Sequence, residues 1–147
     1  MSPNLKAFLD MIAVSEGTKK LGNNGYNVIV GGSLFESYAD HPRKLIWVQA
    51  GLASTAAGRY QLLKRYWDYY KNFLQLKDFS PASQDAVAIQ QIKECRALDD
   101  IEKGYISVAI DKCKRIWASL PGAGYGQHEN SIDKLISAYK AAGGTIG

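Results

Sequence analysis

Two short segments of the chain carry side chains that could together perform acid–base chemistry on a sugar. In the first, residues 13–18, Glu16 comes two residues after the apolar run Ile12-Ala13-Val14, with Ser15 between them. In the second, residues 54–61, Gly58 is followed closely by Tyr60 and Gln61. Breaking a glycosidic bond requires a proton on a poor leaving group, and a carboxylic acid supplies it near neutral pH when burial raises its pKa. The two segments therefore predict one acid and a polar wall that binds a sugar.

Each part of this hypothesis has a simpler alternative. An acid at the end of a helix is commonly a solvated surface residue, although the helix dipole disfavours a negative charge there. Tyr60 and Gln61 offer a phenol and an amide to a ligand, but a packed aromatic and an exposed polar side chain fit the same two positions. The residue pattern alone leaves these alternatives open.

The helix that would carry Glu16 is predicted by its start, its periodicity and its end. Ser2 and Pro3 are typical of an N-cap and a first helical position. Gly17 is typical of a helix end just after Glu16. Apolar residues recur between them at helical spacing, at Leu5, Phe8, Leu9, Ile12 and Ala13.

The rest of the chain predicts a small β-rich lobe followed by helices. Glycines are frequent in residues 18–55, where residues 26–30 and 45–48 have the composition of short strands. Helical periodicity returns over residues 58–74, which would put Tyr60 and Gln61 at the start of a helix. Further helices are predicted after Ser80-Pro81, over residues 106–117 and over residues 132–139. The expected fold is α+β, with a mainly helical body and the β-rich lobe at roughly 18–55, in a single domain over residues 1–147.

Composition and charge narrow the class of function. The net charge is +4, and Lys and Arg are scattered, which favours a diffuse attraction to polyanions over a dedicated nucleic-acid surface. The two Cys and two His lack the spacing of metal ligands, so we expect no metal site. No apolar run predicts a membrane span, and the first six residues do not resemble a signal peptide, so a cytoplasmic starting point is expected.

A glycine-rich loop at residues 121–126 is a second candidate for ligand contact. It lacks the Lys-Ser or Lys-Thr that ends a phosphate-binding loop, and no strand is predicted before it, which excludes a nucleotide site. Two alternatives stay open: a mobile lip with Tyr125 and Gln127 facing a ligand, or an ordinary turn. Gln90, on the helix predicted after Pro81, is either at the floor of a cleft or an ordinary helix glutamine.

Specific motifs follow one another over almost the whole chain: AFLDM at 7–11, SEGT at 15–18, VIVGG at 28–32, DHP at 40–42, GRYQ at 58–61, DFSP at 78–81, SQDA at 83–86 and IWASLPGAGYGQ at 116–127. Their content and order resemble the phage lambda endolysin family, which includes the endolysins of lambda-like and P2-like phages. The resemblance implies a lysozyme-like fold with a cleft between two lobes, acting on bacterial peptidoglycan.

The same resemblance implies a reaction and roles for the candidate residues. A lytic transglycosylase of this family cleaves the bond between N-acetylmuramic acid and N-acetylglucosamine. Glu16 matches the catalytic glutamate, which protonates the glycosidic oxygen and then takes the proton of the muramic acid 6-hydroxyl, closing a 1,6-anhydro ring. Tyr60, Gln61, Tyr125 and Gln127 match family motifs and would line the cleft. Asp40 is not expected to act in catalysis, because Asp40-His41-Pro42 is typical of a turn.

The family also implies partners and a location. Glycan strands of peptidoglycan would be the substrate, and a holin would give the protein access from the host cytoplasm to the cell wall. No metal or organic cofactor, no nucleic acid and no stable membrane insertion are expected, and we expect a monomer. Two alternatives are kept: a hydrolytic muramidase acting on the same bond, and a non-catalytic module that binds glycans.

Overall fold

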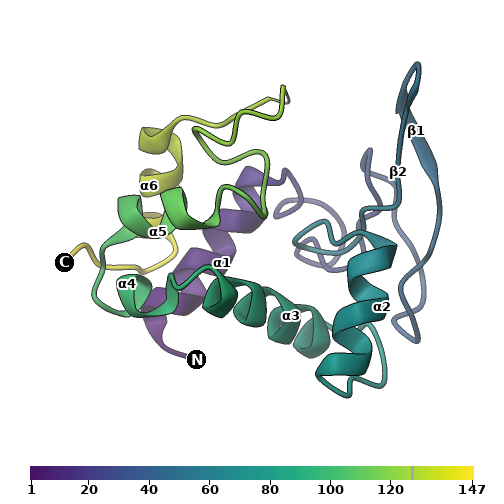
Figure 1. The fold of residues 1–147 in the computed structure, drawn as a ribbon, viewed down its shortest axis with the longest axis horizontal. Helices are drawn as coiled ribbons and strands as arrows, with labels where there is room; N and C mark the ends of the chain where they lie inside the picture. Colours follow the sequence, from purple (N-terminus) through teal and green to yellow (C-terminus); the bar gives the residue numbers. More distant parts are fainter. Residues whose placement is uncertain (127) are drawn as a thin grey trace. The chain divides into compact units, whose positions relative to one another are not determined.

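The computed structural model describes residues 1–126 and 128–147 and is mainly helical (Figure 1). Its elements, in chain order, are α1 (Pro3–Ser15), β1 (Ile46–Gln49), β2 (Leu52–Ser54), α2 (Lys64–Phe73), α3 (Pro81–Glu94), α4 (Leu98–Glu102), α5 (Ile106–Cys113) and α6 (Ile132–Ala141). The α+β class expected from the sequence is confirmed.

The chain divides into two compact units. Residues 1–16 and 88–147 form one, here called the helical unit, and residues 17–87 form the other, here called the sheet unit. The boundary falls within α3, whose residues up to Val87 belong to the sheet unit. The organisation as a single domain, with a lobe at roughly 18–55, stays a prediction.

The helical unit is built around α1. The Ser2 hydroxyl accepts a hydrogen bond from the Leu5 N–H at 3.1 Å, and Pro3 occupies the first helical position, as the sequence predicts. α1 packs against α6 and α4, and α5 contacts both α4 and α6. Because α1 meets neighbours on several sides, its apolar positions from Phe8 to Ala13 are fully or almost fully buried. This packing holds the C-terminal end of α1 in place.

The small sheet of the sheet unit is a two-stranded antiparallel hairpin. Ile46 lies opposite Ser54 and Trp47 opposite Ala53, with a bulge before Gln49 meets Leu52. The strand predicted at 45–48 is thus confirmed with slightly shifted bounds. The strand predicted at 26–30 is wrong: this segment is mostly turns, with isolated bridges from Val28 to Leu34 and from Ile29 to Ala57. Gly25 and Gly31 take positive φ on either side and end any extended run.

Helices in the second half follow the predicted order, with two corrections. α3, α5 and α6 are present, but α5 ends at Cys113 rather than continuing to Trp117, and the short helix α4 was not expected. At the start of α3 the Ser80 hydroxyl accepts from the Ser83 N–H at 3.3 Å, which confirms the predicted cap. Within the described residues, none of the helices combines the length and apolar character that crossing a membrane requires.

Helix α2 begins at Lys64, so the prediction that Tyr60 and Gln61 start a helix is wrong. Ala57 and Leu62 exchange both backbone hydrogen bonds, at 2.8 and 3.1 Å, and the residues between them form a tight loop. Gly58 and Gln61 both have positive φ in this loop. A side chain at position 58 would overlap the Gln84 side chain, so glycine there is required by close packing.

An aromatic cluster forms the core of the sheet unit. Trp67 and Phe79 are fully buried, and their ring centroids lie 5.0 Å apart in an edge-to-face arrangement. The ring centroids of His41 and Phe35 lie 5.0 Å and 6.0 Å, respectively, from that of Phe79. This core therefore joins α2 to the loops of residues 28–41 and to the segment that precedes α3.

Candidate active site

Glu16 stands at the C-terminal end of α1. Its backbone N–H donates to the Ile12 carbonyl at 2.8 Å, and Gly17 follows with φ +77°, which ends the helix as predicted. The Glu16 side chain is half-buried, and its Oε2 accepts a hydrogen bond from the Ser119 hydroxyl. Glu16 therefore sits on a rigid element and faces a neutral donor rather than a cation.

Burial raises the pKa of Glu16 to about 7, and the hydrogen bond from Ser119 opposes part of that shift. The charged carboxylate loses water in this environment, and one hydroxyl group replaces only a fraction of the lost hydration. Near neutral pH such a group exists in both protonation states, so it can give a proton and later accept one. These properties favour the acid hypothesis for Glu16 over that of a solvated surface residue.

Ser15, Ser119 and Asn130 form a hydrogen-bonded network next to Glu16. The hydroxyl oxygens of Ser15 and Ser119 lie 2.7 Å apart. The Asn130 side-chain amide donates to the Ser15 hydroxyl at 3.1 Å and to the Ser15 carbonyl at 3.0 Å. The Asn130 backbone N–H donates to the Ser119 carbonyl at 2.8 Å. The network thus ties the end of α1 to the segments before and after the glycine-rich loop.

The glycine-rich loop is held by Glu129. One carboxylate oxygen accepts from the Gly122 N–H at 2.8 Å and the other from the Gly124 N–H at 3.0 Å. These two bonds hold the pKa of Glu129 below its ordinary value. Tyr125, predicted to contact a ligand, is 58% exposed in this loop. Its partner in that prediction, Gln127, lies outside the described residues.

Tyr60 is a buried member of a polar cluster in the sheet unit. Only 5% of Tyr60 is exposed, and its hydroxyl donates to Asp85 at 2.6 Å. Tyr26 donates to the same carboxylate oxygen at 2.9 Å. The Arg59 guanidinium lies over both tyrosine rings, at 5.2 Å from the centroid of Tyr26 and 5.6 Å from that of Tyr60. The sugar-binding role predicted for Tyr60 stays a prediction, and the contacts give the residue a structural role.

The two glutamines predicted to bind substrate make short-range contacts. Gln61 donates its side-chain amide to the Gly58 carbonyl at 2.9 Å and so closes the loop before α2. Gln90 lies on α3 and donates to the Glu94 carboxylate at 3.1 Å. Glu16, Gln90 and Tyr125 belong to the helical unit, whereas Tyr60 and Gln61 belong to the sheet unit.

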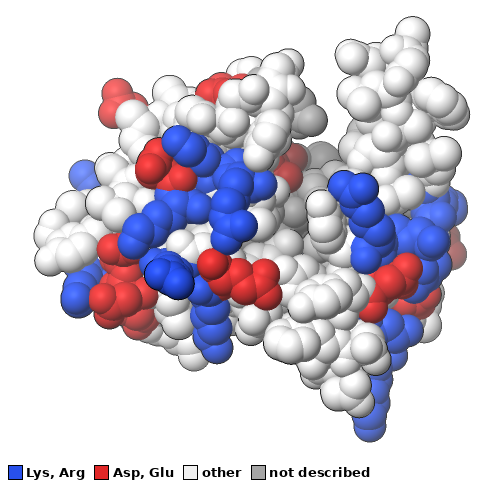
Figure 2. Space-filling view, viewed as in Figure 1, with Lys and Arg blue, Asp and Glu red and all other residues white. Residues whose placement is uncertain are grey.

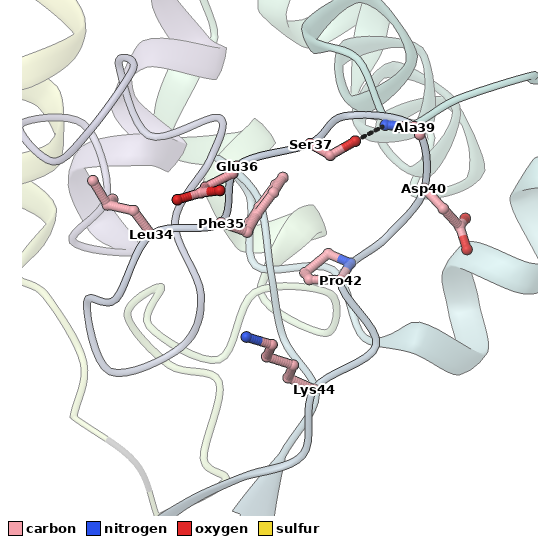
Figure 3. Close-up of a pocket in the computed structure, with 8 residues that line it drawn as sticks. All are labelled: Leu34, Phe35, Glu36, Ser37, Ala39, Asp40, Pro42 and Lys44. Carbon is pink, nitrogen blue, oxygen red and sulfur yellow. Dashed lines mark hydrogen bonds between the residues drawn. The ribbon is translucent and has the colours of Figure 1, made fainter.

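Asp40 is one of the residues that line a pocket of about 530 Å³ in the sheet unit, together with residues 34–37, 39, 42 and 44 (Figure 3). Its carboxylate points out of that pocket toward α2, whereas Glu36 and Lys44 are exposed (Figure 3). Asp40 accepts from Arg43 at 2.7 Å and from the Trp67 indole N–H at 2.9 Å. The Arg43 hydrogen bond, with Trp67, holds the pKa of Asp40 far below its usual range. These contacts make Asp40 a structural anion.

Charged side chains and potential metal ligands of the described residues are the alternatives to a site around Glu16. Lys and Arg are interspersed with Asp and Glu on the face that Figure 2 shows. Within residues 1–126 and 128–147, no group of three or more His, Cys, Asp or Glu side chains is arranged to hold a metal ion. Cys95 and Cys113 are both buried free thiols.

Three residues of the site were missed by sequence reasoning. Ser119 precedes the glycine-rich loop, and Glu129 and Asn130 follow it closely. Ser119 lies inside the motif at 116–127, so its position was marked, but a serine before a proline turn has no chemical signature of its own. The roles of Ser119 and Asn130 depend on contacts with Ser15, which lies more than a hundred residues earlier in the chain, whereas Glu129 acts locally on Gly122 and Gly124.

Comparison with known proteins gives matches over nearly the full length. A family model described as Endolysin matches residues 6–146. The endolysin of Escherichia phage lambda is 63% identical, over 96% of this chain and 92% of the relative. The endolysin of Escherichia phage P2 is 51% identical, over 96% of this chain and 93% of the relative.

Solved structures agree with these relatives. A bacteriophage lambda lysozyme complexed with a chitohexasaccharide is 60% identical, with a TM-score of 0.98, covering 100% of this chain and 98% of that chain. A second lambda lysozyme structure is 59% identical, with a TM-score of 0.93 and the same coverage. The lysozyme-like fold expected from the motifs is therefore confirmed, and the chain belongs to the endolysin family, the lysozyme-like enzymes that degrade bacterial peptidoglycan.

Proposed function

We propose that this endolysin cleaves the MurNAc-β-1,4-GlcNAc bond by lytic transglycosylation, with Glu16 as general acid and then general base. The observation that carries the proposal is the environment of Glu16. Burial raises the pKa of Glu16 to about 7, and its carboxylate accepts a hydrogen bond from the neutral Ser119 hydroxyl. As an acid, Glu16 protonates the leaving oxygen. As the resulting carboxylate, it takes the proton of the 6-hydroxyl while that oxygen attacks C1, which restores the acid and forms the 1,6-anhydro ring.

This reaction requires one carboxyl group, whereas hydrolysis in the usual two-carboxylate schemes requires a second. The 6-hydroxyl is already part of the substrate, so the nucleophile need not be collected from solution. Asp40, the acid that a hydrolytic scheme would draw on, is held as an anion by Arg43 and Trp67. These contacts leave it poorly suited to activate water, because a strongly acidic carboxylate is a weak base.

Digestion of purified Gram-negative peptidoglycan, followed by mass spectrometry of the released fragments, tests the reaction type. We expect 1,6-anhydro-muramic acid ends, which are lighter by one water than hydrolytic ends and resist borohydride reduction. Reducing ends would instead identify a muramidase and overturn the transglycosylase proposal. A Glu16→Gln protein that lysed walls at the parent rate would indicate a module that needs no acid at this position.

The predicted sugar contacts belong to the same proposal. Tyr125 is exposed on a loop that Glu129 holds in shape, which suits stacking on or hydrogen bonding to a glycan. Gln61 and Gln90 are half-buried. Titration of chitohexaose, the ligand in the lambda lysozyme structure, into the Tyr125→Ala protein should show weaker binding with unchanged stability. An unchanged affinity would exclude Tyr125 from the binding surface.

We further propose that the protein accumulates in the host cytoplasm, acts as a monomer and reaches the wall through a holin. Membership of the endolysin family supports this route. Fractionation of cells that express the protein with and without a holin tests the route. Export without a holin would contradict it.

A further inference from the structure

The hydrogen-bond network next to Glu16 has a single direction when the carboxyl group is ionised, because both of its ends are fixed. Asn130 lies between the Lys134 ammonium, 2.9 Å from Oδ1, and the Ser15 carbonyl, 3.0 Å from Nδ2. An ammonium group can only donate and a carbonyl can only accept. The amide orientation is therefore fixed. In the flipped orientation the NH2 group would face the Lys134 ammonium and the amide oxygen would face the Ser15 carbonyl.

The fixed amide at one end and the Glu16 carboxylate at the other order the two serine hydroxyl groups. Asn130 Nδ2 also donates to Ser15 Oγ at 3.1 Å, so this oxygen is an acceptor at that contact. Each serine has a single hydroxyl proton. An ionised carboxylate can only accept, so the Ser119 proton goes to Glu16 Oε2, and the contact of 2.7 Å between the two hydroxyl groups then takes the Ser15 proton. Every link donates toward the carboxyl group.

We propose that Asn130, Ser15 and Ser119 are positioning residues whose one-way hydrogen-bond chain reserves Oε2 of Glu16 as an acceptor and keeps the transferable proton on Oε1. The inference deepens the proposed function and rests on Glu16 as the acid. With Oε2 accepting from Ser119 and the proton of the neutral acid on Oε1, Oε1 gives its proton to the leaving oxygen and later receives the 6-hydroxyl proton. One oxygen thus performs both transfers, without rotation of the carboxyl group.

Burial supports a built network rather than a chance surface contact. Asn130 is 5% exposed and Ser15 is 7% exposed. Two charged groups of the helical unit lie nearby: Lys134 of α6, which binds Asn130, and Glu129, which binds Gly122 and Gly124. Among the described residues, neither of these two groups forms a hydrogen bond with the Glu16 carboxylate. The hydrogen-bond network therefore contacts Glu16 through Ser119.

The test measures the pKa of Glu16 directly, by carbon-detected NMR of its side-chain carboxyl, together with the pH dependence of kcat/KM. Ser119→Ala removes a donor to the charged form, so the Glu16 pKa and the alkaline limb of kcat/KM should rise by about one unit. Ser15→Ala removes only the polarising link, and we expect a rise of about 0.3 unit in the same direction. Ser119→Thr keeps a hydroxyl and should restore the parent value.

Ser137→Ala, at an exposed serine of α6, is the matched control and should shift nothing. Ser15 carries the decisive comparison, because Asn130 also binds backbone carbonyls and its replacement is prone to unfold the unit. A Ser15→Ala protein whose Glu16 has the same pKa as in the Ser137→Ala control would overturn the proposal of a one-way hydrogen-bond chain. The NMR readout separates this failure from failure of the proposed function, which would appear as full activity of Glu16→Gln.

Discussion

Glu16 of the helical unit meets a serine hydroxyl, whereas Asp40 of the sheet unit meets an arginine, an indole N–H and, at 3.6 Å, the Lys71 ammonium. Both are carboxyl groups at the edge of a packed region, yet burial raises the pKa of Glu16 to about 7 and Arg43 pulls the pKa of Asp40 far down. The difference lies in the partners: cations and strong donors stabilise the anion, and one neutral hydroxyl does not replace lost water.

The two units also differ in charge. The helical unit contains nine Lys or Arg and nine Asp or Glu, whereas the sheet unit contains nine and five. The whole net charge of +4 therefore belongs to residues 17–87. A unit without net charge around Glu16 leaves its pKa to local burial, while a basic sheet unit favours attraction to an anionic wall polymer.

Replacing Glu16 by Gln is the strongest test of the contrast between Glu16 as the acid and Asp40 as a structural anion. Because the amide cannot donate the required proton, we expect a loss of turnover of roughly 10²- to 10⁴-fold, measured as release of soluble fragments from peptidoglycan. Glu36→Gln, at an exposed acid of the sheet unit, is the matched control and should keep full activity.

The Glu16→Gln variant should be more stable than the parent protein at alkaline pH. The folded pKa of Glu16 is raised, so the native state keeps a proton that the unfolded state loses, and stability falls as pH rises from about 4.5 to about 7. Removing the group should raise the free energy of unfolding by about 1–3 kcal/mol at pH 8 and leave it unchanged at pH 4. Urea unfolding at both pH values checks this. A loss of stability at pH 8 would mean that Glu16 is a structural residue like Asp40.

Tyr60→Phe separates structure from binding in the sheet unit. The substitution removes one of two hydroxyl groups that donate to Asp85, and it should cost about 1–2 kcal/mol of unfolding free energy. Chitohexaose affinity of the folded variant, measured by calorimetry, should stay within about twofold of the parent. A tenfold loss of affinity with unchanged stability would instead assign Tyr60 to the sugar-binding wall.

Glu129→Gln tests whether the glycine-rich loop of the helical unit takes part in substrate binding. The neutral amide keeps one acceptor for the N–H groups of Gly122 and Gly124 but loses the bidentate carboxylate. We expect KM to rise about threefold with little change in melting temperature, since the loop is exposed and contributes little to packing. An unchanged KM would leave the loop without a part in substrate binding.

Asp40→Asn should have the smallest effect, confined to stability. The lowered folded pKa of Asp40 stabilises the native state above the unfolded value of about 3.8, and this contribution is lost as pH falls below it. The variant should therefore lose a small part of its stability at pH 7 and show a shallower loss between pH 4 and pH 2. Loss of activity without loss of stability would give Asp40 a catalytic role.

The sequence by itself determined the helix that carries the acid, the cap that starts it and the glycine that ends it, because these signals are local. It also determined the family, since motifs such as the one at 116–127 keep their order along the chain. It failed at residues 26–30 and 58–63, where positive φ values and single bridges override the periodicity of the side chains.

Only the tertiary structure decided which groups surround the acid. The contacts of Glu16 with Ser119, and of Ser15 with Asn130, join segments more than a hundred residues apart, and no local pattern encodes them. The buried Tyr60 is a shorter-range example, because its hydroxyl binds Asp85 on α3, 25 residues later in the chain. The physical reason is that a pKa depends on the water and charge around a group, and folding alone sets both.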